Sequence, residues 1–158
     1  MTSQRIGRRA ALFATAAAMI LPAELMRAEA LPPIHVIKGM GCECCEAWVA
    51  YLREQGFAVT DEVSMGTLLI KRKLDLNIPA KAFSCHTGIV DGYALEGHVP
   101  AADIRRLLSE RPDAIGLAVP GMPYGSPGMG DETAREAYDV FLIARDGTTT
   151  VFTSYPAT

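Results

Sequence analysis

Three of the four cysteines lie within four consecutive positions, in the segment GCECCEAW, as Cys42, Cys44 and Cys45. Cys42 and Cys45 have the Cys-x-x-Cys spacing of a reversible disulfide pair, whereas the trans peptide between Cys44 and Cys45 holds their side chains in poor geometry for an S–S bond. Zinc commonly takes four ligands from two separated knuckles, which a compact trio matches poorly. Cu(I) accepts two or three thiolates, and soft sulfur ligands select it. The segment therefore favours either a redox pair, Cys42 and Cys45, or a Cu(I) site in which shared sulfurs can bridge several ions.

A second group of candidate donors lies further along the chain. The segment FSCHTGIV contains the fourth cysteine, Cys85, followed directly by His86. His86 is interpreted either as a ligand or proton partner of the cysteines or as a strand residue with one face to water. Met122 and Met129 in PGMPYGSPGM are further metal candidates, because thioether sulfur binds Cu(I) and glycine and proline leave it exposed. His98 is expected to have a structural role.

The elements around the cysteines must position them, and these elements alternate between strand and helix. A β-branched run at 34–40 predicts a strand, apolar residues at helical spacing predict a helix over 46–56, and 57–63 predicts a second strand. The cysteine cluster then lies at a strand-to-helix junction. Unpaired N–H groups and the positive end of the helix dipole favour thiolate over thiol there, so we expect these cysteines to be strong ligands and nucleophiles.

The alternation continues to the C-terminus. Residues 68–79 are ambiguous between helix and extended chain, residues 85–98 predict a hairpin that turns at Asp91-Gly92, and Pro100 is expected at the first position of a helix. Residues 114–133 are expected to be a loop, and a loop of that length is usually functional or disordered. A final hairpin is predicted over 138–155, around another Asp-Gly turn.

The order β-α-β-(α)-β-β-α is that of a thioredoxin-type domain. The predicted fold class is therefore α/β and thioredoxin-like, with a mixed central sheet flanked by helices and an additional C-terminal β-hairpin. In such a domain the reactive cysteines follow the first strand, and a cis-proline packed against them precedes a later strand. Ser84-Cys85-His86 takes the place of that proline here. We therefore expect the fold to bring Cys85 to the mouth of the cysteine cluster.

Residues 1–30 have the features of a cleaved export signal. A basic start precedes an apolar stretch of about 12 residues, which is too short to span a membrane, and Ala28-Glu29-Ala30 matches a signal-peptidase site. The adjacent Arg8 and Arg9 favour twin-arginine export, with an ordinary secretory signal as the alternative. Cleavage near Ala30 predicts a periplasmic domain of residues 31–158.

The composition of that domain argues against several classes of function. The whole chain has 15 basic and 18 acidic residues, and removal of four arginines and two glutamates with the signal leaves 11 and 16. No basic patch for nucleic acid remains, and no later apolar run has membrane-spanning length. We expect a soluble domain that binds neither nucleic acid nor membrane. Because exported domains often contain disulfides, a structural Cys42–Cys45 or Cys42–Cys85 bond is an alternative explanation for the cysteines.

Three segments together resemble the CopG-like family of exported bacterial proteins associated with copper resistance. They are GCECCEAW, SCHTGIVDGYALEGHVPAADIRRLL and GLAVPGMPYGSPGM, within about residues 34–152. The resemblance implies a thioredoxin-like fold and copper redox handling in the periplasm. It also implies that the copper ligands are Cys42, Cys44, Cys45 and Cys85. One departure is Glu43, which occupies a position where a small residue is expected but removes no ligand.

These observations lead to three hypotheses. The first is a periplasmic Cu(I)-binding protein that contributes to copper resistance by sequestration or by thiol/copper redox chemistry, with copper ions and other periplasmic copper-handling proteins as partners. The second is a thiol–disulfide oxidoreductase that acts on protein partners through Cys42 and Cys45. The third is a carrier for zinc or for cluster assembly. Redox turnover under either of the first two would make the protein an enzyme.

Overall fold

The computed structural model describes residues 31–158, and the predicted export signal lies outside the described residues. Within this part of the chain, seven strands form one sheet, and three α-helices and two short 3₁₀ helices connect them. The elements are β1 (Ile34–Gly39), α1 (Glu43–Glu54), β2 (Val59–Ser64), α2 (Gly66–Asp75), η1 (Ala80–Ala82), β3 (His86–Val90), β4 (Tyr93–Glu96), α3 (Ala101–Glu110), β5 (Ala114–Ala118), η2 (Glu132–Ala134), β6 (Tyr138–Ala144) and β7 (Thr149–Tyr155).

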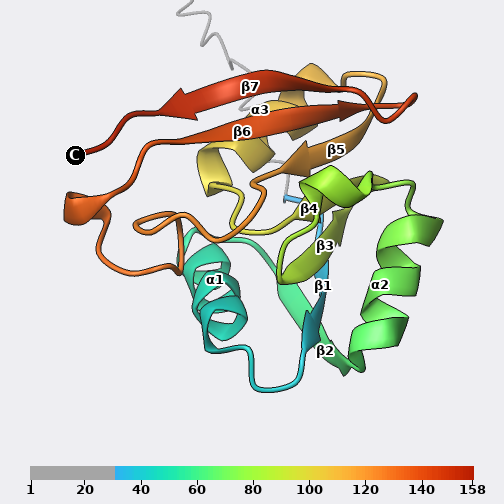
Figure 1. Cartoon of the computed structure of the whole chain (residues 1–158), viewed down its shortest axis with the longest axis horizontal. Helices are drawn as coiled ribbons and strands as arrows, with labels where there is room; N and C mark the ends of the chain where they lie inside the picture. The colour runs from blue at the N-terminus through green and yellow to red at the C-terminus, as the bar shows by residue number, and fades with distance from the viewer. Residues whose placement is uncertain (1–30) are drawn as a thin grey trace, which may run out of the picture.

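The sheet is mixed, which confirms the predicted α/β class. Its strand order is β2-β1-β3-β4-β5-β6-β7. The pairs β1–β2 and β4–β5 are parallel, and the other four neighbouring pairs are antiparallel. The predicted C-terminal hairpin is present as β6 and β7, and it extends the sheet beyond β5 (Figure 1). The predicted hairpin of β3 and β4 is also present.

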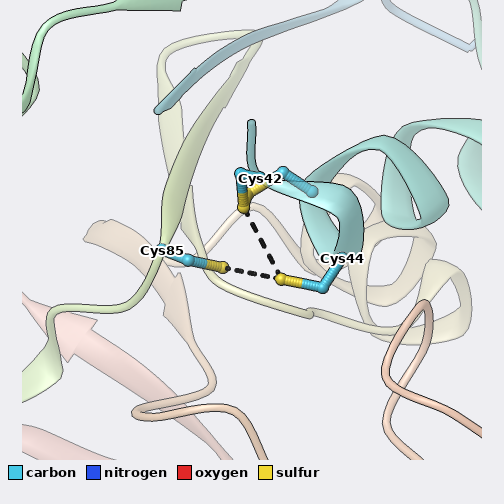
Figure 2. Close-up of side chains that lie close together, drawn as sticks. Cys42, Cys44 and Cys85 are labelled. Atoms are coloured by element: carbon cyan, nitrogen blue, oxygen red, sulfur yellow. Dashed lines mark hydrogen bonds between the residues drawn. A yellow bond between two sulfur atoms is a disulfide. The ribbon is translucent and has the colours of Figure 1, made fainter. Parts of the chain in front are cut away.

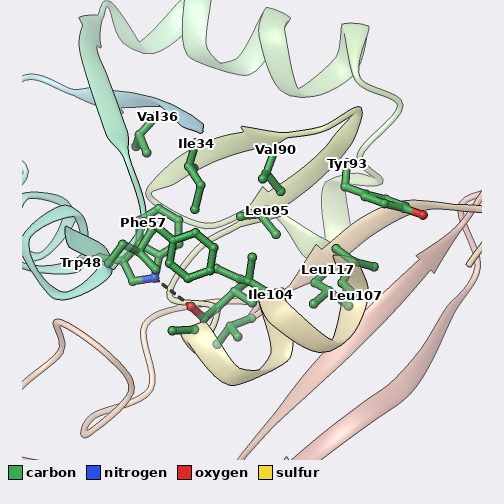
Figure 3. Close-up of a cluster of buried hydrophobic side chains, with 14 of the residues drawn as sticks. Ile34, Val36, Trp48, Phe57, Val90, Tyr93, Leu95, Ile104, Leu107 and Leu117 are labelled. Atoms are coloured by element: carbon green, nitrogen blue, oxygen red, sulfur yellow. Dashed lines mark hydrogen bonds between the residues drawn. The ribbon is translucent and has the colours of Figure 1, made fainter. Parts of the chain in front are cut away.

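Two hydrophobic clusters cover the two faces of the sheet. The larger cluster packs α1 and α3 against one face, with Trp48, Leu52, Ile104 and Leu107 buried among residues from β1, β4 and β5 (Figure 3). The smaller cluster lies on the other face and includes Ile78. The apolar residues whose helical spacing predicted α1 are therefore those that it buries against the sheet. This packing holds in place the helix that begins at the cysteines.

The structure corrects two of the predicted element boundaries. Residues 114–118, expected to begin a long loop, form strand β5, and every residue of this strand is buried. A short strand covered on both faces lacks the alternation of polar and apolar residues by which a strand is usually recognised. Pro100 is the N-cap of α3 rather than its first residue.

The ambiguous segment 68–79 is mostly helical. It contributes the larger part of α2, which ends at Asp75. Within α2 only Leu69 and Lys73 are buried, so the apolar residues Leu68, Ile70 and Leu74 remain exposed. Their exposure blurs the helical pattern and explains why the sequence alone did not decide the segment.

Among residues 31–158, no helix is both long enough and apolar enough to cross a membrane.

Candidate metal centre

The turn between β1 and α1 presents the cysteine cluster. Gly41 has a φ of +68°, a left-handed conformation that glycine adopts without strain, and it directs the chain from the strand into the helix. Cys42 is the N-cap of α1, and its carbonyl accepts hydrogen bonds from the N–H groups of Cys45 and Glu46. Lys38, buried at the end of β1, forms an ion pair with Glu46 at 2.6 Å. The first turn of the helix is therefore tied to the strand that precedes it.

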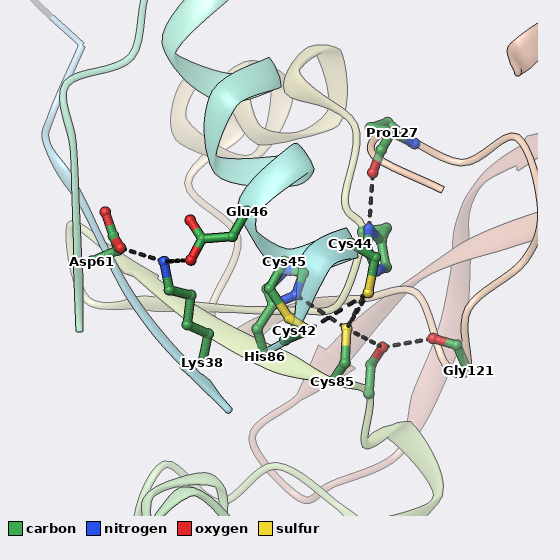
Figure 4. The surroundings of a disulfide bond; sticks show 12 residues. Lys38, Cys42, Cys44, Cys45, Glu46, Asp61, Cys85, His86, Gly121 and Pro127 are labelled. Atoms are coloured by element: carbon green, nitrogen blue, oxygen red, sulfur yellow. Dashed lines mark hydrogen bonds and ion pairs between the residues drawn. A yellow bond between two sulfur atoms is a disulfide. The ribbon is translucent and has the colours of Figure 1, made fainter. Parts of the chain in front are cut away.

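Cys42 and Cys45 form a disulfide in this structure, whereas Cys44 and Cys85 are free thiols (Figure 4). The two bonded cysteines are those with Cys-x-x-Cys spacing, which the sequence identified as the redox candidates. The Cys42–Cys45 disulfide was one of the alternatives left open. In this form only two of the four sulfurs are available as thiolates, so a four-thiolate site requires the disulfide to be reduced.

All four cysteine sulfurs lie within 4.8 Å of one another. The Cys44 Sγ is 3.6 Å from the Cys42 Sγ and 3.8 Å from the Cys85 Sγ (Figure 2). These separations suit sulfurs that share one ion or bridge neighbouring ions, because a metal–thiolate bond is about 2.3 Å long for zinc and two such bonds span at most about twice that. The expected meeting of Cys85 with the cluster is thus present in the structure.

The register of the sheet explains how Cys85 reaches the other three cysteines. Strands β1 and β3 are antiparallel, and Lys38 near the end of β1 pairs with His86 at the start of β3. The residue just before β3 must therefore lie beside the turn that follows β1. Cys85 is that residue, and the turn leads into Cys42.

A buried polar network holds the segment that carries Cys85. Glu96 of β4 is fully buried and accepts hydrogen bonds from the Ser84 N–H at 2.6 Å and from the Thr87 hydroxyl at 2.7 Å. Lys73 of α2 forms an ion pair with the same carboxylate and donates to Thr87 at 2.9 Å. Burial raises the pKa of Glu96, and the Lys73 ammonium acts in the opposite direction. Because Ser84 and Thr87 flank Cys85 and His86, this network fixes the backbone on both sides of the candidate donors.

Two histidines contact the Cys85 sulfur. His86 Nδ1 lies 3.2 Å from it, and His98 Nε2 lies 3.3 Å from it. Both imidazoles are fully buried, so the interpretation of His86 as a water-facing strand residue is wrong. Sequence reasoning gave His98 only a structural role, because it is 13 positions from Cys85 and only the β3–β4 hairpin brings the two together. Burial lowers the pKa of both histidines, so both rings are neutral near pH 7.

Trp48 lies beneath this part of the site as a core residue. Its ring is fully buried and packs against the His86 ring with centroids 4.3 Å apart and the planes tilted by 34°, and its indole N–H donates to the Val99 carbonyl at 3.0 Å. The same contact fixes the ring plane of His86.

The backbone of the Pro-Gly-Met segment contacts the site at Gly121 and at Gly128, and its Pro127 carbonyl lies 2.8 Å from His98 Nδ1. The Ser84 hydroxyl donates to the Gly121 carbonyl at 2.6 Å, and Gly128 packs against the backbone of α1 at Trp48. Met122 follows the first point and is 55% exposed, whereas Met129 follows the second and is partly buried. The structure thus brings the segment beside the cysteines, although neither thioether is part of the group of four sulfurs.

The Cys85 thiol is protonated at neutral pH in the metal-free protein. Burial is the main cause and the neighbouring Cys44 the next, and together they raise the pKa of Cys85 to about 12. The sequence led us to expect ionised sulfurs at a helix N-terminus, but Cys85 lies just before β3 rather than in the first turn of α1. A metal ion at this site must therefore displace the Cys85 proton.

Comparisons with known proteins place these residues in context. A family model described as "Protein of unknown function, DUF411" matches residues 82–129, which include Cys85, both buried histidines and the Pro-Gly-Met segment. Two solved structures described as copper resistance protein CopG, form 1 and form 2, are each 44% identical to this chain. Each match covers 80% of this chain and 99% of the solved chain, with TM-scores of 0.75 and 0.74. No curated protein matches the chain.

Proposed function

Since the chain belongs to the family of CopG copper resistance proteins, we propose that it is a periplasmic protein that holds Cu(I) in a multi-thiolate site. The proposed ligands are Cys42, Cys44, Cys45 and Cys85. Met122 and Met129 are proposed as outer ligands, because their segment is anchored beside the cysteines, and His86 as a residue that borders the site. The protein would contribute to copper resistance by sequestering copper or by exchanging electrons between copper and its thiols.

The observation that carries this proposal is the meeting of four sulfurs within 4.8 Å, three from the start of α1 and one from the segment just before β3. Soft thiolates favour Cu(I) over harder ions, and their close spacing suits shared sulfurs that bridge more than one ion. A zinc site would need four ligands in a regular tetrahedron. The adjacent residues Cys44 and Cys45, in one helical turn, are poorly placed to supply two corners of a tetrahedron. Copper is therefore the better candidate.

We further propose that the segment from β1 to α3 is a thioredoxin-like unit. In support, β1-α1-β2-α2-β3-β4-α3 occur in that order along the chain, and the sheet order of these strands is β2-β1-β3-β4. The Cys42–Cys45 pair begins the helix after the first strand, as reactive cysteines do in thioredoxin-type domains. Strands β5, β6 and β7 are then additions to this unit.

The disulfide gives the proposed redox chemistry a definite balance. When the Cys42 and Cys45 thiolates join, they release two electrons, and two Cu(II) ions that each take one become two Cu(I) ions. In a separate reaction, two external thiols reduce the disulfide and are themselves joined in a disulfide, which regenerates the two thiols and restores four sulfurs to the site. Export to the periplasm, through the signal proposed in residues 1–30, would place this chemistry where other copper-handling proteins can act as partners.

The disulfide itself supports a second candidate function. A Cys-x-x-Cys disulfide at the start of a helix is the arrangement of thiol–disulfide oxidoreductases, in which protein partners are the substrates. In that case Cys44 would not be needed for activity. The two functions therefore make opposite predictions for a Cys44 variant.

Anaerobic titration with Cu(I) in the presence of a chromogenic Cu(I) chelator tests the copper proposal. The fully reduced protein is expected to withdraw at least one Cu(I) per chain from the chelator. A variant with all four cysteines changed to serine is expected to withdraw none. Less than one Cu(I) per reduced chain, or equal binding by the serine variant, would contradict the proposal.

A further inference from the structure

Helix α2 has an apolar surface that no other part of the described chain covers. The helix packs against β1, and its only buried residues are Leu69 and Lys73. The side chains of Leu68, Ile70 and Leu74 are each at least half exposed. We propose that the exposed face of α2 is a docking surface for an anionic lipid bilayer. This inference goes beyond the proposed copper function and does not depend on it.

The net charge of this part of the chain is opposite in sign to that of the rest of the domain. Residues 63–83 contain four basic residues and one acidic residue, a net charge of +3, whereas the rest of residues 31–158 contains 7 basic and 15 acidic residues, a net charge of −8. Lys73 is buried against Glu96, so the exposed charged residues of the segment are Lys71, Arg72, Lys81 and Asp75. A negatively charged surface would therefore attract α2 and repel most of the remaining protein, which orients the domain with α2 toward that surface.

The spacing of residues along α2 arranges aliphatic and basic side chains side by side on its exposed face. Ile70 and Leu74 are four positions apart and therefore lie on one side of the helix, next to Lys71. Leu68 and Arg72, also four positions apart, lie on the other side of Lys71. In a helix that lies in the plane of a bilayer surface, aliphatic side chains enter the boundary between headgroups and acyl chains, while lysine and arginine extend their charged ends to the headgroups. The composition led us to expect no membrane binding because the domain has no run of spanning length, but a helix in the interface needs none.

The same surface is a poor match for a protein partner. Protein interfaces are anchored by aromatic and arginine side chains that fill pockets, whereas the exposed apolar residues of α2 are aliphatic. The groove between α2 and β2 is lined mainly by polar and charged side chains. A second copy of this chain in a two-fold interface would place Lys71 and Arg72 against the same residues of its partner, so like charges would meet. An anionic bilayer matches both the aliphatic side chains and the positive charge.

The docking surface begins at the end of the sheet where the cysteines lie. In the parallel pairing of β1 and β2, Gly39 is opposite Ser64, so Met40 and Met65 follow at the same end of the two strands. Both side chains are highly exposed, Met40 at 81% and Met65 at 69%. Helix α2 begins directly after Met65, and the turn after Met40 leads to Cys42 (Figure 1). Docking would therefore hold the turn that carries the cysteines close to the bilayer surface.

Vesicle sedimentation tests the proposal with residues 31–158, which contain the whole sheet and both hydrophobic clusters. We expect binding to vesicles of phosphatidylglycerol and phosphatidylethanolamine, no binding to vesicles of phosphatidylcholine alone, and weaker binding as the salt concentration rises. Ile70→Ser/Leu74→Ser should weaken binding about tenfold or more, because two aliphatic side chains no longer enter the bilayer. Val151→Ser is the control, since Val151 is 54% exposed on β7, and it should bind as wild type does.

A second pair of variants tests the charge of the surface separately. Lys71→Gln/Arg72→Gln should weaken binding to the anionic vesicles about tenfold. Arg111→Gln/Arg145→Gln removes two exposed arginines elsewhere on the domain and should bind as wild type does. No binding to the anionic vesicles, or equal binding by wild type and Ile70→Ser/Leu74→Ser, would overturn the proposal. Self-association in sedimentation velocity that Ile70→Ser/Leu74→Ser abolishes would also overturn it, because the face would then belong to a second copy of the chain.

Discussion

The sulfur atoms of Cys44 and Cys85 lie 3.8 Å apart, although 41 positions separate the two residues in the chain. Cys44 is in the first turn of α1, and Cys85 immediately precedes β3. The antiparallel pairing of β1 with β3 makes this meeting a consequence of the sheet, because the end of β1 leads into α1 and the start of β3 lies beside it. The three sulfurs at the start of α1 are thus joined by a fourth from a distant part of the chain.

Cys44→Ser separates copper binding from disulfide exchange. It removes a sulfur next to both Cys42 and Cys85 but leaves the Cys42–Cys45 disulfide intact. Under the copper proposal, reduced Cys44→Ser binds Cu(I) more weakly than wild type in chelator competition. Any reduction of insulin disulfides by the Cys42–Cys45 pair should survive the change. Strong, Cys44-independent insulin reduction combined with unchanged copper affinity would favour the oxidoreductase function instead.

Gly128→Ala is expected to displace the Pro-Gly-Met segment from the site. A Cβ at this position would lie 2.6 Å from the backbone nitrogen of Trp48, and φ is +82°. Gly121→Ala is the matched control, because its φ is +71° but its Cβ would meet nothing within 4 Å. Both variants incur about 1–2 kcal/mol of left-handed strain, so the additional loss in Gly128→Ala reports the clash. Urea denaturation measures it, and equal losses in the two variants would show that the packing at Trp48 is not needed.

The buried pair of Lys73 and Glu96 should respond unequally to single and double substitution. Lys73→Met leaves a fully buried carboxylate without its cation and should cost about 3–5 kcal/mol of unfolding free energy. Lys73→Met/Glu96→Leu removes both charges. Its loss of unfolding free energy should be smaller than that of Lys73→Met, or only slightly larger, because an apolar pair can replace a buried ion pair at small cost. Chemical denaturation of the three proteins checks this. A double variant that loses far more unfolding free energy than Lys73→Met would contradict this, because removal of the second charge would then not relieve the unpaired carboxylate.

The metal-free disulfide form should become less stable as the pH falls below about 6.5, the ordinary pKa of histidine. Burial lowers the pKa of His86 and His98 in the folded protein, so below that pH the unfolded chain takes up protons that the folded protein does not. The unfolding free energy should therefore fall with decreasing pH, by up to about 1.4 kcal/mol per pH unit for each histidine. Denaturation between pH 7.5 and 5.5 measures the slope. His98→Gln should reduce that slope, and an unchanged slope would contradict the assignment.

Much of the fold followed from local patterns in the sequence. The helical spacing of Trp48 and Leu52 predicted α1, and the two Asp-Gly turns predicted both hairpins, because these signals depend on neighbouring residues. Strand β5 was missed because it is buried on both faces and shows no alternation. Helix α2 was left ambiguous because several of its apolar residues are exposed.

The site was predictable to the extent that it follows from spacing and fold order. The cysteine cluster and the approach of Cys85 could be anticipated, but the part played by His98 could not. His98 reaches Cys85 only through the β3–β4 hairpin, and its orientation depends on a carbonyl of Pro127, 29 positions later. The pKa of Cys85 also depends on burial at the meeting of several elements, which no local pattern reports.

The central claim is that Cys85 completes a copper site that begins in α1. The most direct test compares the Cu(I) affinity of reduced wild-type protein with that of reduced Cys85→Ser, by competition with a chromogenic chelator under anaerobic conditions. We predict at least a tenfold weaker affinity in the variant, equivalent to about 1.4 kcal/mol, because Cys85 lies beside both Cys44 and His98. Equal affinities would contradict the account, since the Cys-x-Cys-Cys segment would then bind copper without the fourth sulfur.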